Sequence, residues 1–256
     1  MGSGPAVVLL HWVPFSGRMY DEELAVLAAR GHRAIAVDLI GFGRSAQAVP
    51  RLGFTEHAGV LGEALPVIGV ESCAVLGAHY SAPVACEVAL AQPVDIHALC
   101  IDGAAHLLPP DAVLAIAARL DRLAGPGWHE DGSHRTYLWD QAESALRIFD
   151  PAFVPSPGNV HLVYRMILDY LSSGMPADFG GFAPYDMAGR LALLDLPVIV
   201  LSAETDPLLP AFAPTLAVAR RALGRVIPGG HPLHDPARVG VYAHELADLL
   251  AQCSGQ

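Results

Sequence analysis

The chain has 256 residues, of which 53% are hydrophobic and 16% are charged. This length suits one domain with a full hydrophobic core and room for one insertion. The formal net charge is -11 and no basic stripe is present, so nucleic acid is excluded as an expected partner, because a polyanion would be repelled. All fifteen basic residues are arginine, so no lysine is available to form a Schiff base with a substrate or with pyridoxal phosphate.

The cysteines and the apolar stretches indicate the compartment. None of the four cysteines belongs to a C-x-x-C pair, and three of them lie in apolar runs, which is typical of buried thiols in a reducing environment. No apolar stretch reaches the roughly 18 residues that a membrane span needs. No cationic segment precedes the short apolar run near the N-terminus, so no secretory signal is expected. The sequence therefore predicts a cytoplasmic protein that does not enter a membrane.

Short apolar runs alternate with helical patterns along most of the chain, which indicates crossover units and a largely parallel sheet. Strands are expected at residues 6–12, 33–39, 72–76, 96–101, 197–202 and 225–227. Three helices are expected between or after these strands, with Asp21, Thr55 and Asp235 as their N-terminal caps. The fold class is therefore α/β.

The alternation breaks between residues 105 and 189, where Trp, Tyr, His, Pro and Gly residues cluster. This segment is predicted to be a helical lid, inserted into a core made of residues 1–104 and 190–256. Asp111 can cap a helix over residues 112–124, and a second helical stretch is expected at residues 160–171.

A strand-to-helix turn is predicted at Gly77-Ala78-His79-Tyr80-Ser81. Such a turn is strained and close-packed, so it needs small residues two positions before and after its centre, and Gly77 and Ser81 meet that need. The central residue is His79. A mechanism that begins with attack by a hydroxyl group therefore lacks its first reactant at this position.

Five short segments in a fixed order carry a resemblance to a known family. They are residues 10–17 after the first strand, 38–45 after the second, the turn at 77–81, 203–206 and 229–231. In this order the chain resembles the α/β-hydrolase superfamily, most of all its lidded branch of epoxide hydrolases and dehalogenases. The resemblance implies a mostly parallel sheet with a helical lid.

The same resemblance implies roles for single residues. Asp206 matches the catalytic acid of the family and His231 its general base, while Val13 and Tyr80 match the two oxyanion-hole amides. The chain departs from the family at three places. His79 replaces the nucleophile, Trp12 follows His11 where the family has glycine, and the sheet is expected to be shortened by two strands at its N-terminal edge.

The chemistry of the aspartate and histidine pair does not depend on the family. A carboxylate on one imidazole nitrogen fixes the tautomer and raises the basicity of the other nitrogen. His231 is therefore expected within hydrogen-bond reach of Asp206, with His79 beside it as one half of a coupled, proton-shuttling pair. Asp102 is an alternative acid, and its other interpretation is a carboxylate that caps the following loop.

Several other side chains have two interpretations. Ser81 and Ser16 are candidate substitute nucleophiles, although Ser81 also suits close packing. The histidines after residue 230 do not have the spacing of an established metal site, so no metal is expected. Five aromatic residues of the lid segment could line a pocket or simply pack, namely Trp128, Trp139, Tyr164, Tyr170 and Phe182.

The resulting hypothesis is an enzyme that needs no cofactor and uses acid/base chemistry on a small, apolar, aromatic or polyketide-like molecule. Elimination, cyclisation, isomerisation, or water-mediated opening of an ester, lactone or epoxide would each fit. The alternatives are an ester or lactone hydrolase with a displaced nucleophile, and an inactive protein that binds a small molecule. The sequence leaves open whether the chain forms a homodimer.

Overall fold

The computed structural model describes residues 1–46, 52–122, 129–150, 152–172, 184–230 and 239–254. Its centre is a six-stranded sheet with the order β2-β1-β3-β4-β5-β6, in which every neighbouring pair is parallel. The strands are β1 (Ala6–Leu10), β2 (Arg33–Val37), β3 (Ser72–Ala78), β4 (Asp95–Asp102), β5 (Val198–Ala203) and β6 (Ala222–Ile227).

The central strands are buried on both faces, which explains why they read as continuous apolar runs. In β1, Val8 and Leu10 pack into one hydrophobic cluster, while Val7 and Leu9 pack into the other. Successive side chains of a strand point to opposite faces, so both layers of helices need apolar partners from the same strand.

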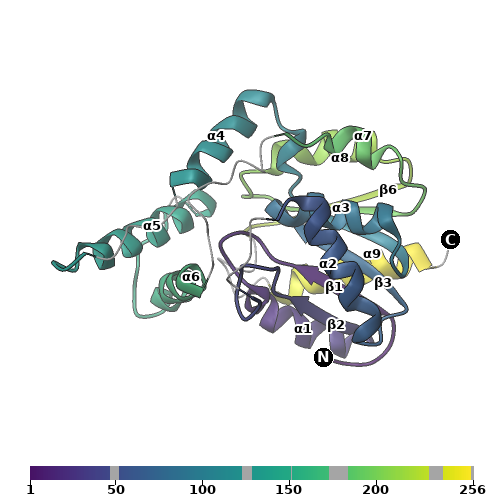
Figure 1. Cartoon of the computed structure of the whole chain (residues 1–256), viewed down its shortest axis with the longest axis horizontal. Coiled ribbons are helices and arrows are strands. Elements are labelled where there is room, and N and C mark those ends of the chain that lie inside the picture. Colours follow the sequence, from purple (N-terminus) through teal and green to yellow (C-terminus); the bar gives the residue numbers. More distant parts are fainter. Residues whose placement is uncertain (47–51, 123–128, 151, 173–183, 231–238, 255–256) are drawn as a thin grey trace.

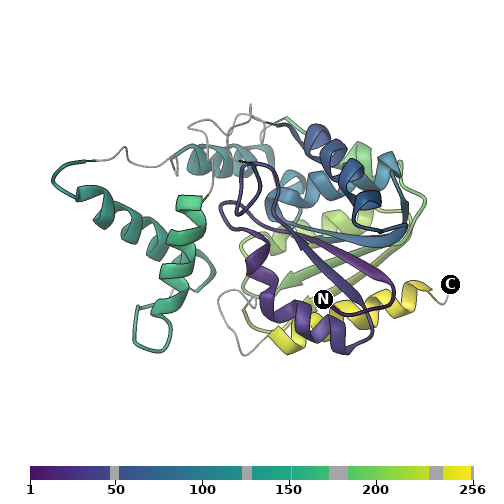
Figure 2. The same cartoon turned by 60° about the horizontal axis from the view of Figure 1, so that its bottom comes forward.

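Helices cover both faces of this sheet. On one face lie α1 (Asp21–Ala29) and α9 (Val239–Ser254), which contact each other beneath the strands (Figure 2). The other face is covered by α2 (Phe54–Val67), α3 (Ala82–Ala91), α7 (Met187–Leu191) and α8 (Phe212–Val218) (Figure 1). The architecture is therefore a three-layer α/β sandwich.

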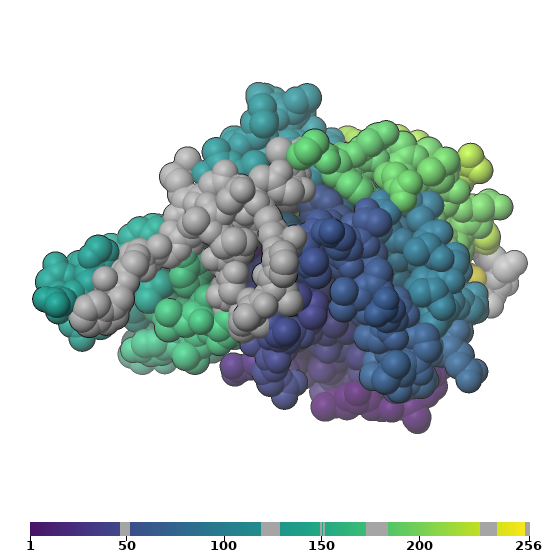
Figure 3. All heavy atoms as spheres, in the orientation of Figure 1, coloured from purple at the N-terminus to yellow at the C-terminus, as the bar shows by residue number. Residues whose placement is uncertain are grey.

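Three further helices lie beside the sandwich rather than in it. They are α4 (Pro110–Arg122), α5 (Ser133–Phe149) and α6 (Val160–Ser172), and they stand together on one side of the molecule (Figures 1 and 3). Among the described residues, this segment contributes no strand to the sheet. That arrangement agrees with the predicted helical lid, whose boundaries at residues 105 and 189 stay a prediction.

All six predicted strands are present, and their ends differ from the predicted ones by a few residues. The second helix begins at Phe54 with Gly53 as its cap, not at Thr55, and the Gly53 amide donates to the Glu56 carboxylate at 2.6 Å. Helix α5 was not predicted. The predicted cap at Asp235 lies outside the described residues.

Two expectations from composition have structural counterparts. Three of the cysteines, Cys73, Cys86 and Cys100, are buried free thiols. Within the described part of the chain, no helix combines the length and apolar character needed to cross a bilayer.

Candidate active site

The predicted turn follows β3 and brings His79 to the carboxyl end of the sheet. His79 has a backbone φ of 50°, in the left-handed region that side chains rarely adopt. A Cβ atom at Gly77 would lie 2.3 Å from the Ser81 carbonyl oxygen, so only glycine fits there. The turn therefore holds His79 in a strained position from which its side chain reaches the space above the strands.

Ser81 anchors this turn. Its side chain is fully buried, and its hydroxyl lies 2.8 Å from both the Leu10 and His11 carbonyl oxygens and accepts a bond from the Ala78 amide at 3.2 Å. A hydroxyl enclosed by backbone groups in this way holds β1 and β3 together. The packing role expected for Ser81 fits this geometry.

His79 is hydrogen-bonded to Asp206, a residue 127 positions away in the sequence. Its Nε2 atom lies 2.8 Å from the Asp206 Oδ2 atom. The Asp206 side chain is fully buried just after β5, and its Oδ1 atom accepts the Leu208 amide at 2.7 Å. The His79 side chain remains 14% exposed. A buried, oriented carboxylate thus holds an imidazole that remains partly exposed.

Charge around His79 favours the protonated imidazole. Burial lowers the pKa of His79, but the Asp206 carboxylate, its hydrogen bond and the nearby Asp102 carboxylate together outweigh burial, so the pKa is raised above its usual value. Because the carboxylate accepts the Nε2 proton, Nδ1 is the nitrogen that can accept a proton when the imidazole is neutral and release it again from the imidazolium.

Asp102 is the second carboxylate of this group. It is fully buried at the end of β4, and the Tyr242 hydroxyl of α9 donates to its Oδ2 atom at 2.7 Å. This partner comes from a helix distant in sequence, so Asp102 is more than a cap on its own loop. No sequence pattern predicts the contact between Tyr242 and Asp102, because the position of Tyr242 along α9 indicates only a core residue.

His79, Asp102 and Asp206 each offer one ligand atom, and these atoms all lie within 4.8 Å of one another. Nitrogen and carboxylate donors at this separation are the kind that divalent metal ions accept. Here the donors already bond to protein groups, since each carboxylate accepts at least one hydrogen bond at 2.8 Å or shorter. Each of the three side chains therefore already has a protein hydrogen-bond partner within the described part of the chain.

Trp12 lies flat against His79. The two ring centroids are 3.9 Å apart and the planes differ by 13°, which is a stacked contact. The Trp12 backbone is held at two points. Its amide donates to the Met19 sulfur at 3.3 Å, and its carbonyl accepts the Nδ1 proton of His11 at 2.7 Å. The tryptophan in place of glycine therefore becomes one wall of the site.

His11 is a structural residue. Its Nε2 atom accepts the Leu39 amide at 3.1 Å, which leaves the proton on Nδ1 for the Trp12 carbonyl. Burial lowers the pKa of His11 to about 4, although the Trp12 carbonyl opposes this shift. His11 is thus neutral near pH 7 and ties β1 to the segment after β2.

A cavity of about 400 Å³ opens beside His79, within the range of small-molecule sites. Val13 and Tyr80, the residues matched to the oxyanion-hole amides, both line it, together with side chains from α4, α5 and α6. Its described lining consists of Trp12, Val13, Pro14, Phe15, His79, Tyr80, Ala105, Leu108, Ala112, Ala115, Ile116, Ala145, Ile148, Met166, Pro207 and Leu208. Within this set, His79 is the one side chain that ionises near neutral pH.

The described aromatic wall of the main cavity is made by Trp12, Phe15 and Tyr80, which precede the helical segment. Trp139 and Tyr164, for which lining and packing were both open, do not line this cavity, and their rings contact each other with centroids 5.8 Å apart. A run of aromatic and proline residues at 12–15 was the available signal. Trp128 and Phe182 lie outside the described residues.

Two candidate residues from the sequence remain, Ser16 and His231. Ser16 is 1% exposed, and its hydroxyl donates to Asp169 of α6 at 2.9 Å, so it joins the loop after β1 to that helix. His231 lies outside the described residues, and its predicted contact with Asp206 stays a prediction.

No family model matches the chain. Over 262 residues it is 26% identical to a protein named as the carbamate hydrolase RutD of Variovorax paradoxus (strain S110), with 98% of this chain and 93% of that protein covered. It is 33% identical over 110 residues to epoxide hydrolase 2 of Siraitia grosvenorii, a match that covers 42% of this chain and 34% of that protein.

A similar solved structure is a thermophilic esterase from Thermogutta terrifontis. Its TM-score is 0.77 at 20% identity, with 99% of this chain and 92% of that chain covered. The parallel sheet, the turn after β3 and these matches agree with one another. The chain therefore has the α/β-hydrolase fold, and the resemblance to that superfamily predicted from its sequence is confirmed.

Proposed function

We propose that the chain is a cofactor-independent enzyme in which His79 and Asp206 form the acid/base pair. The observation that carries this proposal is the 2.8 Å bond between His79 Nε2 and Asp206 Oδ2 at the edge of an apolar cavity. An imidazole on a buried carboxylate is a base of suitable strength near neutral pH. It occupies the position at which the superfamily keeps a nucleophile.

In this mechanism, Asp206 keeps the proton on Nε2 and stabilises the imidazolium that forms when Nδ1 accepts a proton. If the proton comes from a water molecule, the resulting hydroxide opens an ester, lactone, carbamate or epoxide. If it comes from a substrate carbon, elimination, isomerisation or cyclisation follows. The names of the carbamate hydrolase and epoxide hydrolase relatives favour the water-mediated reaction. The Val13 and Tyr80 amides are the proposed donors to the developing oxyanion.

The cavity lining supports a neutral and largely apolar substrate. A carboxylate, phosphate or coenzyme A group would need a fixed cation, and the described lining offers only His79. The three aromatic side chains at positions 12, 15 and 80 favour a substrate that carries an aromatic or other planar ring.

A displaced nucleophile is the less supported alternative. Ser81 is fully buried and bonded to backbone groups, and Ser16 is 1% exposed and bonded to Asp169. Neither hydroxyl lines the cavity beside His79. His231 keeps its proposed part as a second base, in which case it and His79 would share protons as a coupled pair.

The experiment uses a panel of neutral aryl esters, lactones and styrene oxide, with deuterium uptake from D2O by aryl ketones as the test for carbon acids. His79→Asn tolerates the left-handed backbone but cannot exchange a proton, so it should lose about 10²-fold or more of the turnover. Asp206→Asn should lose a similar factor, because the wrong tautomer is then favoured. His244→Asn, an exposed histidine on α9, should keep full activity.

The pH profile provides a second test. As a base, His79 must be neutral, so turnover should fall as the pH drops below its raised pKa, with a midpoint above the usual 6.5. Full turnover by His79→Asn would remove His79 from the mechanism. Ligand-induced stabilisation without turnover of any panel member would favour the binding protein, and acyl-enzyme accumulation would favour the displaced nucleophile.

A further inference from the structure

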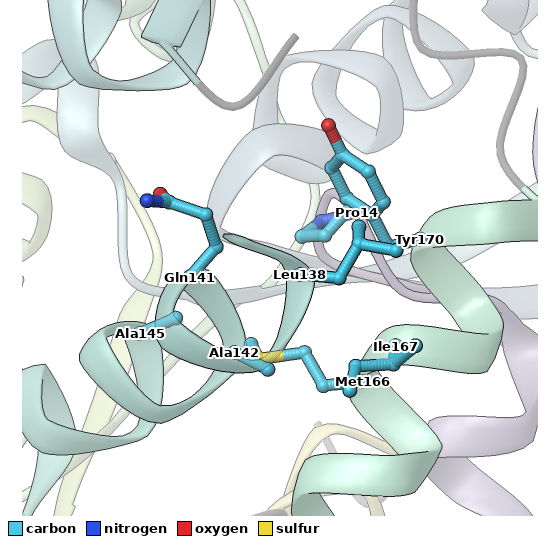
Figure 4. A pocket seen from close by; sticks show the side chains of 8 residues that line it. All are labelled: Pro14, Leu138, Gln141, Ala142, Ala145, Met166, Ile167 and Tyr170. Carbon is cyan, nitrogen blue, oxygen red and sulfur yellow. The ribbon is translucent and has the colours of Figure 1, made fainter. Parts of the chain in front are cut away.

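A second, smaller cavity lies next to the main one, between α5 and α6 (Figure 4). It measures about 20 Å³, which is space for a single water molecule. Its lining is Pro14, Leu138, Gln141, Ala142, Ala145, Met166, Ile167 and Tyr170. Three of these residues, Pro14, Ala145 and Met166, also line the main cavity, so they form the wall between the two spaces.

Met166 is the residue of this wall that can change shape. Pro14 has a ring fixed to the backbone, and Ala145 carries a single methyl group. Met166 has an unbranched side chain with three rotatable bonds, and it is only 5% exposed. It belongs to the same buried cluster as Trp12 and Phe15, which line the main cavity. Of the three side chains shared by the two cavities, Met166 is thus the one whose conformation can change the space between them.

We propose that Met166 is a specificity-determining residue that sets the length of the apolar ligand the site accepts. A neutral ligand whose polar group lies at His79 would direct its apolar chain toward α5 and α6, where Met166 ends the available space. A smaller side chain would join the two cavities, and a larger one would shorten the main cavity. This inference rests on the proposed function only in taking the ligand at His79 as the substrate.

The test measures binding rather than turnover, so it is independent of the proposed chemistry. The probes are straight-chain alkyl phenyl ketones from acetophenone upward, which are neutral and carry one carbonyl acceptor for His79. The dissociation constant of each is measured by calorimetry, together with the shift in Tm, for the unmodified protein and for Met166→Ala, Met166→Phe and Ile167→Ala.

The unmodified protein should show a length limit beyond which affinity falls. In Met166→Ala this limit should move to longer chains, with about tenfold or tighter binding of the first ketones beyond the original limit. Met166→Phe keeps the position filled and should move the limit to shorter chains. Ile167→Ala is the matched control, because Ile167 lines only the smaller cavity and leaves the wall intact.

An unchanged limit in both Met166 variants would overturn the inference, as would an equal shift in Ile167→Ala. It would also be overturned if no ketone stabilised any of the four proteins, because the cavity would then not take neutral apolar ligands. A shifted limit in a protein that turns over no substrate would support the inference and count against the proposed function alone.

Discussion

At the scale of single residues, the contact between Trp12 and His79 affects the chemistry of the site alongside the bond to Asp206. Their rings are stacked with centroids 3.9 Å apart, and Trp12 is 2% exposed. An indole face attracts a cation, with energies of about 0.5–2 kcal/mol that rise as the pair is removed from water. Trp12 therefore holds the imidazole plane and favours its protonated form. A glycine, which the resemblance to the superfamily implies at this position, would offer neither effect.

Because of this stacked contact, the fluorescence of Trp12 should report the protonation state of His79. A protonated imidazole in ring contact quenches indole emission, so the intensity should fall as the pH is lowered through the raised pKa of His79. The transition should have its midpoint above 6.5 and should vanish in both Trp12→Phe and His79→Asn. The chain has three tryptophans, and a transition of equal amplitude in Trp12→Phe would assign it to the others and contradict the interpretation.

At the scale of elements, α6 is joined to the loop after β1 by a buried polar pair. The Ser16 hydroxyl donates to Asp169 Oδ1 at 2.9 Å, while the Oδ2 atom is buried without a hydrogen-bond partner among the described residues. Burial raises the pKa of Asp169, although Ser16 and nearby arginines oppose the shift. A raised carboxyl pKa stabilises the folded state at low pH, and this stabilisation is lost as the pH rises through the folded-state pKa.

Asp169→Asn removes this titration. Its free energy of unfolding relative to the unmodified protein should therefore increase from about pH 4 upward, by about 1.4 kcal/mol for each unit by which the pKa is raised. Ser16→Ala removes a hydrogen bond that lowers the pKa, so it should make the pH dependence steeper. Urea unfolding at pH 4, 6 and 8 measures both. A pH-independent difference for Asp169→Asn would show that Asp169 ionises as freely in the folded state as in the unfolded one.

Helices α3 and α7 are connected by a second polar group. Glu87 is 5% exposed, and Arg190 donates to both of its carboxylate oxygens at 2.8 and 2.6 Å, while the Tyr185 hydroxyl donates at 2.7 Å. Such a two-point arginine contact is directional and strong. It fixes α7 just where the chain returns from the helical segment to β5.

Arg190→Ala should lower the free energy of unfolding by about 1–3 kcal/mol, because it leaves the buried Glu87 carboxylate with fewer donors. Arg225→Ala is the control. Arg225 pairs with Glu245 at 3.2 Å on a more exposed surface, so its loss should cost less than about 1 kcal/mol. Chemical denaturation of both variants measures the difference, and equal costs would mean that burial of Glu87 adds nothing.

At the scale of the whole molecule, the structure consists of two parts, the α/β sandwich and the group of helices α4, α5 and α6 beside it. The central strands β1, β3, β4 and β5 are largely buried on both faces, whereas α4, α5 and α6 stand to one side of the sandwich (Figures 1 and 3). The main cavity lies where the two parts meet, because its lining combines residues of the strand ends with residues of α4–α6. We therefore expect ligand entry to depend on movement of α4, α5 and α6 and not on unfolding of the sheet.

Hydrogen exchange should reveal this division. Amides of α5 and α6 should exchange at lower free energies of opening than those of β1, β3 and β4, whose bonds break only on global unfolding. A bound apolar ketone should slow exchange in α4–α6 and leave the central strands unchanged. Uniform exchange across the chain, or ligand protection confined to α1 and α9, would contradict this arrangement. Mass spectrometry of peptic fragments resolves these segments.

The sequence by itself determined the sheet and the turn that carries His79. The central parallel strands are buried on both faces and appear as apolar runs, and all six strands were predicted. The turn was predicted because only small residues fit two positions either side of its centre, as Gly77 shows. Helix α5 has apolar residues at helical spacing, at positions 138, 142, 145 and 149. The helix was not predicted because many polar residues lie between these positions.

Only the tertiary structure decided which groups meet. His79 and Asp206 are separated by 127 positions, and Tyr242 lies 140 positions from Asp102, so no local pattern links either pair. Their contacts depend on how the ends of β3, β4 and β5 converge and on the helix that packs beneath them. The aromatic wall at Trp12 arises in the same way, because a ring at the end of one strand covers the turn that follows its neighbour. Local residue preferences fix the elements, whereas the packing of distant elements fixes the chemistry between them.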